Sequence, residues 1–300
     1  MGRRLNAQSS ICLIGFGEVG QTLAADLRDR GYSNIAAWDT LFADDSSKPS
    51  RVAASGLAKA SGSAREAVAG AELTICAVTA AQCVDAARTA APHLSNGAYF
   101  VDLNSVAPNT KMLAAQSISD HGGRYVEAAV MAPIGPKRIA TSMLLGGPHA
   151  ADFESWAPVL GFTGARTFAD EFGKASAAKM CRSVMIKGVE ALLTESLLSA
   201  RRYGVESTVL ESLGNLFPGM DWPTLSAYMI SRSLQHGRRR AEEMREVAVT
   251  VRDAGIDPHM SLAIASRQDW AATHASAAAI QPLESMLDAI LTTIADPRSK

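Results

Sequence analysis

The chain has 300 residues, of which 29 are Lys or Arg and 30 are Asp or Glu, so its formal net charge is −1. That length corresponds to about two domains of roughly 150 residues each, and similar numbers of each charge in the two halves argue against a sequence-independent nucleic-acid binder. A hydrophobic fraction of 47% with 20% charged residues is too apolar for a disordered chain, and no apolar run reaches the roughly 18–20 residues of a membrane span.

The first half of the chain alternates short apolar patterns with helical patterns. Strands are expected at residues 10–14, 34–38, 72–78, 98–101 and 125–130, with a final pair at 142–145 and 165–168. Helices are expected between them, the first at residues 18–30. This alternation predicts right-handed βαβ units and a doubly wound parallel sheet of the Rossmann type.

After about residue 172 the pattern predicts helices alone. Residues 175–202 form a helix candidate about 42 Å long at 1.5 Å per residue, and Gly204 is placed to end it. Further helices are expected at residues 206–214, 222–235, 237–254, 259–275 and 282–295. We therefore expect an α/β domain over residues 1–170 and an all-α domain over residues 171–300.

Cysteine and histidine usage bears on location and metal binding. Cys12, Cys76, Cys83 and Cys181 show no C-x-x-C spacing, and we expect reduced, mostly buried thiols in a cytoplasmic protein. Residues 1–6 contain arginines without a cleavable signal pattern behind them. The six histidines have no His or Cys three or four residues away, so no metal site is predicted.

A glycine motif follows the first expected strand. The pattern G-x-G-x-x-G is present as Gly15-Phe16-Gly17-Glu18-Val19-Gly20. It opens an expected helix at the start of a βαβ series, which is the context that makes this otherwise weak pattern informative. The glycines allow a tight turn and let backbone N–H groups approach a pyrophosphate at the positive end of a helix. The alternative is a glycine-rich turn without a ligand.

Asp39 ends the second expected strand, about 20 residues after the motif. At that position a carboxylate accepts hydrogen bonds from the ribose hydroxyls of NAD and repels a 2′-phosphate. Because no arginine lies at residues 40–47, we expect NAD rather than NADP as the cofactor. The alternative is an aspartate that simply faces solvent.

Two further strand ends carry candidate site residues. Asn104 and Ser105 follow one expected strand, and Val78 and Thr79 end another. Ligands of parallel sheets bind at the carboxyl ends of the strands, so these four residues are expected to line the cofactor or substrate. Asn104 and Ser105 can also cap the helix that begins at Pro108, and both interpretations can hold together.

The glycine motif, residues 102–108 and the segment Gly173-Lys174-Ala175-Ser176-Ala177-Ala178-Lys179 together resemble the β-hydroxyacid dehydrogenase family, which includes 3-hydroxyisobutyrate and 6-phosphogluconate dehydrogenases. Residues 102–108 are similar to the family's D-x-S-T-x-x-P segment, and residues 173–179 are similar to its G-x-G-x-x-x-K segment, with Ala175 in place of the second glycine. Within the family the chain resembles a bacterial branch with a divergent helical C-terminal domain. The resemblance implies a catalytic Lys179, with Asn104 and Ser105 beside the nicotinamide and the substrate, and a homodimer formed through the helical domain.

The chemistry of such an enzyme requires a group that takes the hydroxyl proton while a hydride leaves the same carbon. A lysine does this near neutral pH only if burial, the positive nicotinamide ring or neighbouring cations lower its pKa. Lys179, Ser183 and Lys187 stand at i, i+4 and i+8 and share one helix stripe, which makes Ser183 and Lys187 candidate substrate residues. The alternative is a solvated lysine face on a long helix.

Several positions depart from the family pattern. Ser183 stands where the family has Asn, and Ile186 stands where phosphogluconate dehydrogenases have Glu, so that reaction is not expected. The substrate-binding Ser-Gly-Gly segment is replaced by Met131-Ala132-Pro133, and Glu242-Glu243-Met244 falls where a K-D-L motif is expected. We therefore expect a rebuilt pocket and a bulkier or more hydrophobic substrate.

One cluster of positive charge is present, as His236-Gly237-Arg238-Arg239-Arg240. An arginine fork such as that of Arg239 can hold a carboxylate or a phosphate of the substrate. The alternative is a solvated helix whose arginines pair with Glu242, Glu243 and Glu246.

The leading hypothesis is an NAD-dependent oxidoreductase that acts on an alcohol or hydroxyacid, with no membrane or nucleic-acid partner. One alternative, motivated by the rebuilt pocket, is a lyase or decarboxylase that oxidises its substrate transiently, cleaves a C–C bond and accumulates no NADH. Another is a non-catalytic NAD-binding sensor, which would tolerate Lys179→Met without loss of function.

Overall fold

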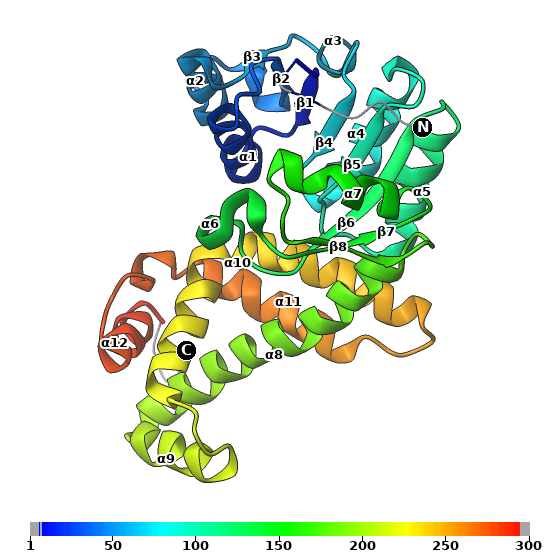
Figure 1. Cartoon of the computed structure of the whole chain (residues 1–300). Coiled ribbons are helices and arrows are strands. Elements are labelled where there is room, and N and C mark those ends of the chain that lie inside the picture. Colours follow the sequence, from blue (N-terminus) through cyan, green and yellow to red (C-terminus); the bar gives the residue numbers. More distant parts are fainter. Residues whose placement is uncertain (1–5, 7, 295–300) are drawn as a thin grey trace. The chain divides into compact units, whose positions relative to one another are not determined.

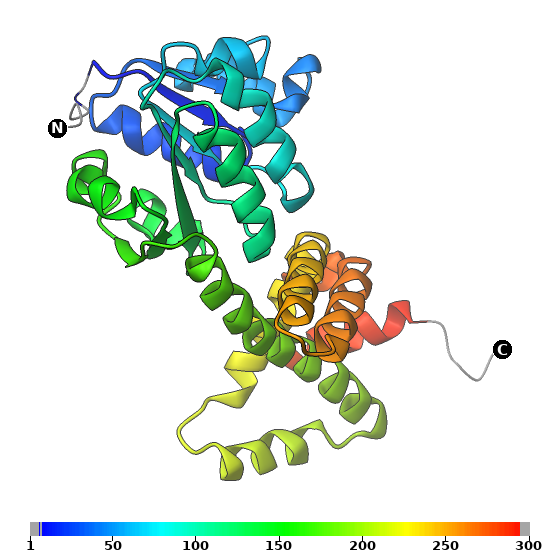
Figure 2. The same cartoon turned by 90° about the vertical axis from the view of Figure 1, so that its right-hand side faces the viewer.

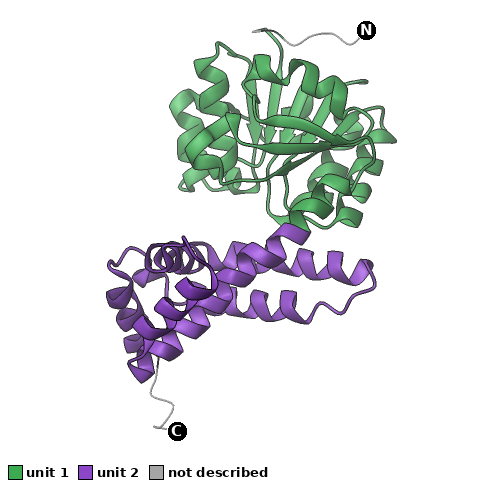
Figure 3. Cartoon of the chain, turned by 60° about the horizontal axis from the view of Figure 1, so that its bottom comes forward, with its two compact units in different colours: residues 1–180 green, residues 181–300 purple. Residues whose placement is uncertain are grey.

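The computed structural model describes residue 6 and residues 8–294. The chain forms two compact units, Met1–Met180 and Cys181–Lys300 (Figure 3). The expected boundary at residue 170 falls just before the long helix α8 (Lys174–Tyr203), whose first turns belong to the first unit. Residues 1–5, where no cleavable signal pattern is expected, and residue 295, the expected end of the last helix, lie outside the described residues.

The first unit is built on one eight-stranded sheet in the order β3-β2-β1-β4-β5-β6-β7-β8 (Figure 1). Its strands are β1 (Ile11–Ile14), β2 (Ile35–Trp38), β3 (Lys59–Ala60), β4 (Leu73–Cys76), β5 (Tyr99–Asp102), β6 (Arg124–Val130), β7 (Met143–Gly146) and β8 (Ala165–Ala169). Seven of them lie where the apolar patterns predict strands. The eighth, β3, has two exposed residues and is too short to produce a pattern.

Strand direction agrees with the prediction for the first six strands and differs for the last two. β1 to β6 are parallel, whereas β7 is antiparallel to β6 and β8 is parallel to β7. A parallel connection needs a crossover of a dozen or more residues, usually a helix. Residues 131–142 contain Pro133, Pro136 and the short helix α6 (Ile134–Lys137), so the chain returns directly. Helix α7 (Ala150–Leu160) then provides the crossover from β7 to β8.

Helices cover both faces of the sheet, because successive residues of a buried strand point to opposite sides. Besides α6 and α7, the helices of this unit are α1 (Glu18–Asp29), α2 (Lys48–Val52), α3 (Ala64–Val68), α4 (Cys83–Ala90) and α5 (Pro108–Ser119), and helices lie on both sides of the sheet in Figure 2. Ile11 and Leu13 of β1 pack in one core with residues of α1 and α7, and Cys12 and Ile14 pack in a second core with residues of α3, α4 and α5. The doubly wound α/β fold predicted from the sequence is therefore present.

The second unit is all helical. After α8 it contains α9 (Glu206–Leu216), α10 (Trp222–Asp253), α11 (His259–Ala272) and α12 (Leu283–Thr293). Its core is formed by apolar side chains of these helices, among them Leu197, Ile230, Leu234, Met286 and Ile290. Among the helices that the structure describes, none combines the length and the apolar character needed to cross a bilayer.

Helix α10 is continuous where two helices were predicted, because Gly237 does not interrupt it. A Cβ on Gly237 would lie 2.3 Å from the carbonyl oxygen of Gln268 and 2.9 Å from the backbone nitrogen of Ala272, both on α11. Glycine inside a helix costs about 1 kcal/mol relative to alanine. Here it permits α10 and α11 to pack closely, so the glycine signals a helix contact rather than a helix end.

Candidate active site

The glycine turn lies at the carboxyl end of β1, where the strand order reverses between β1 and β4. Gly15 has a φ of +89°, and a Cβ there would lie 2.3 Å from the carbonyl oxygen of Ala77. A Cβ on Gly20 would lie 2.2 Å from the carbonyl oxygen of Gly15. Both positions therefore require glycine. Such a reversal point is where ligands of open α/β sheets bind.

The start of α1 is suited to an anion. Its N-cap residue is Gly17, which has no side chain that could cap the helix. A Cβ on Gly17 would meet nothing within 4 Å, so the turn leaves space beside these backbone N–H groups. Glu18 is exposed in the first turn and Val19 is half-buried against the core. Unsatisfied N–H groups at the positive end of a helix bind phosphate, and the segment therefore fits the pyrophosphate of a dinucleotide.

Asp39 connects the end of β2 to the glycine turn. Its carboxylate accepts hydrogen bonds from the backbone N–H of Phe16 at 2.7 Å and of Leu41 at 2.9 Å. Phe16 is buried, and its ring packs edge-on against Phe42 with the centroids 5.9 Å apart. Each carboxylate oxygen has a second lone pair, so Asp39 can hold the turn and still accept a hydrogen bond from a ribose hydroxyl.

Asn104 joins the ends of β4 and β5. Its side-chain oxygen accepts a hydrogen bond from the backbone N–H of Val78 at 2.7 Å, and its amide donates to the Cys76 sulfur at 3.4 Å. Asn104 is buried, whereas Val78 is half-buried and Thr79 is exposed. Asn104 therefore orients the strand ends, and Val78 and Thr79 are the accessible members of this group. The N-cap residue of α5 is Ala107, so neither Asn104 nor Ser105 occupies the cap position itself.

Lys179 and Ser105 meet in the first unit. The Lys179 Nζ donates a hydrogen bond to the Ser105 Oγ at 2.5 Å. Ser105 lies in the loop after β5, and Lys179 lies in the second turn of α8; both are half-buried. The two residues are 74 positions apart in the sequence, and the fold brings an amine and a hydroxyl together. Such a pair can hold and transfer a proton at a substrate oxygen.

Asp102, Lys111 and Glu127 are buried ionisable residues that the sequence does not single out as site residues, with exposed fractions of 1%, 0% and 0%. The Lys111 Nζ lies 3.0 Å from a carboxylate oxygen of Asp102. Burial alone lowers the pKa of Lys111, but the nearby carboxylates outweigh burial and the pKa lies above its ordinary value. A glutamate within the apolar pattern of residues 125–130 was the signal available in the sequence.

The expected substrate loop follows β6. Met131 is half-buried, and Ala132 and Pro133 are exposed, so the loop presents apolar surface. It is attached to α1 through Arg138, whose Nε lies 2.6 Å from a carboxylate oxygen of Asp26. Arg138 has a φ of +51°, a conformation that costs an L-residue of order 1–3 kcal/mol and requires such anchoring.

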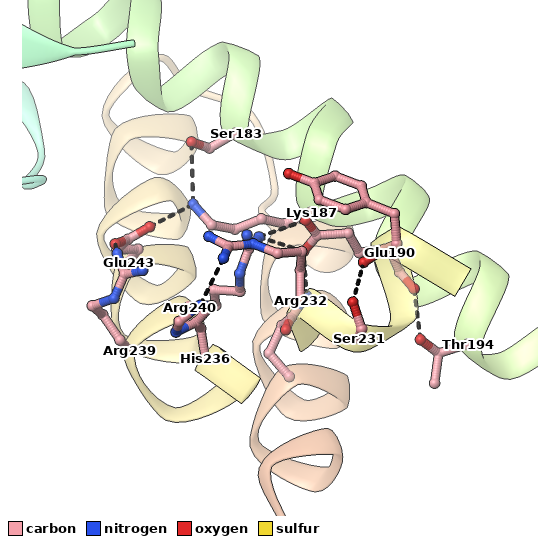
Figure 4. A network of polar contacts seen from close by, with 12 residues as sticks. Ser183, Lys187, Glu190, Thr194, Ser231, Arg232, His236, Arg239, Arg240 and Glu243 are labelled. Atoms are coloured by element: carbon pink, nitrogen blue, oxygen red, sulfur yellow. Dashed lines mark hydrogen bonds and ion pairs between the residues drawn. The ribbon is translucent and has the colours of Figure 1, made fainter. Parts of the chain in front are cut away.

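Ser183 and Lys187 lie in the second unit, within a network of polar contacts between α8 and α10 (Figure 4). The Lys187 Nζ lies 2.7 Å from a carboxylate oxygen of Glu243 and donates to the Ser183 Oγ at 3.3 Å. Lys187 and Ser183 are both buried. Their polar groups are thus paired with each other and with Glu243, which occupies a position where the family pattern has K-D-L.

The arginine cluster has three different environments. Arg238 is exposed, and Arg239 pairs with Glu243 four residues later at 2.7 Å, the contact expected for a solvated helix. Arg240 points inward and donates to the Glu190 carboxylate of α8 at 2.6 Å (Figure 4). Gln268 of α11 donates to the same carboxylate at 3.1 Å. Glu190 therefore connects three helices; its burial raises its pKa and the Arg240 guanidinium opposes the shift.

Two family models match the chain. The NAD-binding domain of 6-phosphogluconate dehydrogenase matches residues 10–173, and a domain of unknown function, DUF1932, matches residues 200–271. The first match covers more than half of the chain and contains the glycine turn, Asp39, Asn104 and Ser105.

Solved structures are similar to this chain over nearly its whole length. A conserved hypothetical protein from Sinorhizobium meliloti 1021 is 36% identical over 96% of this chain and 97% of its own, with a TM-score of 0.73. The conserved protein MTH1747, of unknown function and reported as structurally similar to 3-hydroxyacid dehydrogenases, is 31% identical over 95% and 100% of the two chains, with a TM-score of 0.69. Mycobacterium tuberculosis 3-hydroxyisobutyrate dehydrogenase is 16% identical over 94% and 99%, with a TM-score of 0.70, a likeness of fold alone.

Proposed function

The chain belongs to the family of the NAD-binding domain of 6-phosphogluconate dehydrogenase and is a β-hydroxyacid dehydrogenase-like oxidoreductase, and on that premise we propose that it transfers a hydride between a nicotinamide cofactor and an alcohol or hydroxyacid, with Lys179 as the general acid and base. The hydrogen bond between Lys179 and Ser105 carries this proposal. It brings an amine and a hydroxyl together beside the carboxyl end of β5, on the side of the sheet where β1 ends in the glycine turn.

The nicotinamide ring, when bound, supplies the acceptor or donor of the hydride. During oxidation Lys179 takes the proton of the substrate hydroxyl while the hydride leaves the same carbon; during reduction Lys179 returns a proton to the carbonyl oxygen. Ser105 accepts a hydrogen bond from Lys179, so its own hydroxyl hydrogen can be donated to the substrate oxygen. The pair thereby orients the reacting oxygen and handles its proton.

We assign NAD rather than NADP to the site. The Asp39 carboxylate is fixed by two backbone N–H groups at the end of β2. A fixed negative charge there accepts the ribose hydroxyls of NAD and repels the 2′-phosphate of NADP. A difference of at least tenfold between the dissociation constants of NADH and NADPH, about 1.4 kcal/mol, is the expected result.

The apolar loop formed by Met131, Ala132 and Pro133 supports a substrate with a bulky or apolar portion. We retain Ser183, Lys187 and Arg239 as proposed substrate contacts. Exchanging Lys187 for methionine tests that assignment, and a substrate KM that does not change would contradict it.

We also propose a cytoplasmic homodimer that forms through the helical unit. Leu192 of α8 and Leu216 of α9 are 61% and 69% exposed, and apolar side chains of this kind are suited to a partner surface. Sedimentation equilibrium of the purified protein measures the oligomeric state.

The decisive experiment is a screen of alcohols and hydroxyacids with NAD, following NADH absorbance and product mass together. Lys179→Met should lower turnover by at least about 100-fold, the contribution of general acid–base catalysis, while NADH binding measured by fluorescence stays unchanged. Lys174→Met is the matched control, because Lys174 is an exposed lysine of the same helix. Full activity of Lys179→Met, or a cleaved product formed without accumulation of NADH, would overturn the proposal.

A further inference from the structure

Glu127 is a fully buried carboxylate whose two oxygens both bind the start of α8. One oxygen accepts a hydrogen bond from the backbone N–H of Gly173 at 2.6 Å, and the other accepts one from the backbone N–H of Ser176 at 2.5 Å. The first turn of α8 contains no acidic residue of its own. The first N–H groups of a helix have no partner within the helix, so β6 supplies the cap for α8, and the first N–H that it binds, that of Gly173, lies 46 residues later in the sequence.

The neighbouring strand is adapted to this carboxylate. Gly146 of β7 is the register partner of Glu127 in β6, and a Cβ on Gly146 would lie 2.9 Å from a Glu127 carboxylate oxygen. The Ser176 hydroxyl also donates to the carbonyl oxygen of Gly173 at 3.1 Å, which closes the first turn. The position of the carboxylate is therefore fixed by packing as well as by hydrogen bonds.

A second buried carboxylate, that of Asp102, fixes the loop that carries Ser105, the hydrogen-bond partner of Lys179. Asp102 accepts a hydrogen bond from the backbone N–H of Asn104 at 2.8 Å and another from the Tyr125 hydroxyl at 2.6 Å. It thus fixes the loop that carries Ser105. Lys111 donates to the backbone carbonyl of Asp102 at 3.0 Å and forms an ion pair with its carboxylate. The charges of Asp102 and Glu127 both favour the charged form of Lys111 and raise its pKa against the effect of burial.

We propose that Glu127 is a positioning residue for Lys179, and that the buried set Asp102, Lys111 and Glu127 holds the two segments whose contact is the Lys179–Ser105 hydrogen bond. Glu127 fixes the start of the helix that carries Lys179, and Asp102 fixes the loop that carries Ser105. Two segments that are both held by buried, hydrogen-bonded carboxylates keep a constant separation, and displacements of about 1 Å at a reacting group cost about 100-fold in rate. This proposal rests on the proposed function in naming Lys179 as the reacting group.

The test uses Glu127→Gln, which keeps the size of the side chain but removes its charge and one of its two acceptors. Glu171→Gln is the matched control, because Glu171 is an exposed glutamate that pairs with Lys174 at the same helix end. The rate at which acetic anhydride labels Lys179, relative to the exposed Lys48 of α2, is measured by peptide mass spectrometry. Loss of one charge-assisted hydrogen bond should raise the relative rate by about tenfold in Glu127→Gln, and leave it unchanged in Glu171→Gln.

Backbone amide spectra give a readout that needs neither substrate nor cofactor. The Gly173 and Ser176 amide protons should resonate far downfield in the native protein, because both make short hydrogen bonds to a carboxylate, and should move upfield in Glu127→Gln. Glu127→Asp, which retains the carboxylate, should recover part of the native labelling rate and of the turnover.

A folded Glu127→Gln variant with native Lys179 labelling would overturn the proposal. If that variant does not fold, Gly146→Ala displaces the carboxylate from the opposite strand and should give the same labelling change. Rapid hydrogen exchange of the Gly173 and Ser176 amides in the unmodified protein would also overturn it. Because labelling and amide exchange are independent of turnover, they distinguish failure of this proposal from failure of the proposed function.

Discussion

Replacement of Lys111 by methionine should destabilise the first unit by about 3 kcal/mol. The change keeps an unbranched side chain of similar length and removes only the charge and the hydrogen bonds. Lys111 makes two contacts at 3.0 Å, one to a carboxylate oxygen and one to the backbone oxygen of Asp102. Removing one partner of a buried ion pair costs 3–5 kcal/mol, because the other charge stays buried without it.

The structure places the expected cost at the lower end of that range. Asp102 keeps the Tyr125 hydroxyl and the Asn104 backbone N–H as hydrogen-bond donors when the lysine is lost. The pKa of Lys111 is raised in the folded state, so its contribution is complete below the unfolded pKa of 10.5 and is lost only as the pH rises through the higher folded value. Measurements at neutral pH therefore report the whole contribution.

Urea unfolding of the full chain, followed by circular dichroism, measures the effect. Lys59→Met is the control, because Lys59 makes an exposed ion pair at 3.6 Å and should lose less than about 1 kcal/mol. The double variant Lys111→Met, Asp102→Asn removes both charges and should be more stable than Lys111→Met alone. A loss below about 1 kcal/mol for Lys111→Met, or a double variant no better than the single one, would refute the reasoning.

Asp39→Asn should weaken NADH binding by about tenfold and narrow the preference over NADPH, as measured by cofactor fluorescence, because it removes the charge that accepts ribose hydroxyls; an unchanged preference would contradict the assignment. Gly237→Ala should cost 1–3 kcal/mol in urea unfolding because its Cβ meets the Gln268 carbonyl, whereas Gly214→Ala in α9, where no atom lies within 4 Å, should gain about 0.5–1 kcal/mol. Burial lowers the pKa of His274 below 6.5, so the folded state keeps its full stability above that pH and loses stability as the pH falls and the unfolded chain takes up the proton. His274→Gln should therefore reduce the change of melting temperature with pH below about pH 6.5, and an unchanged slope would count against this assignment.

Local patterns were sufficient for most of the fold. The helix expected at residues 175–202 is α8, Lys174–Tyr203, and the strand expected at residues 10–14 is β1, Ile11–Ile14. Both depend on hydrophobic periodicity and on glycine at the ends, which are properties of neighbouring residues. The direction of β7 was wrong in the prediction, because the connection over residues 131–142 contains two prolines and returns directly, where a parallel pairing with β6 would need a crossover.

Helix phase explains why the arginine cluster could not be interpreted from the sequence. The predicted helices at residues 222–235 and 237–254 leave the orientation of residues 238–240 relative to the preceding helix undefined, whereas in a continuous helix successive residues are rotated by about 100°. That rotation sends Arg238 and Arg239 to solvent and Arg240 inward to Glu190. One sequence motif thus has both a solvated and a buried member, and only the tertiary contact of Gly237 with α11 decides which is which.

Tertiary contacts also explain why the lysine motif of residues 173–179 tolerates Ala175 in place of its second glycine. Gly173 has a φ of +88°, and a Cβ there would lie 3.1 Å from the Pro108 Cβ, so the backbone conformation and the neighbouring chain both require glycine. Ala175 is buried within the first turn of α8, where a right-handed backbone accepts a methyl group at lower cost than glycine. The departure at Ala175 therefore leaves the helix start intact, because the start is set by Gly173 and by the Glu127 cap. The position of Lys179 on α8 therefore depends on the conformation of Gly173 and on the Glu127 cap. Glu127 lies on β6, which is outside the lysine motif.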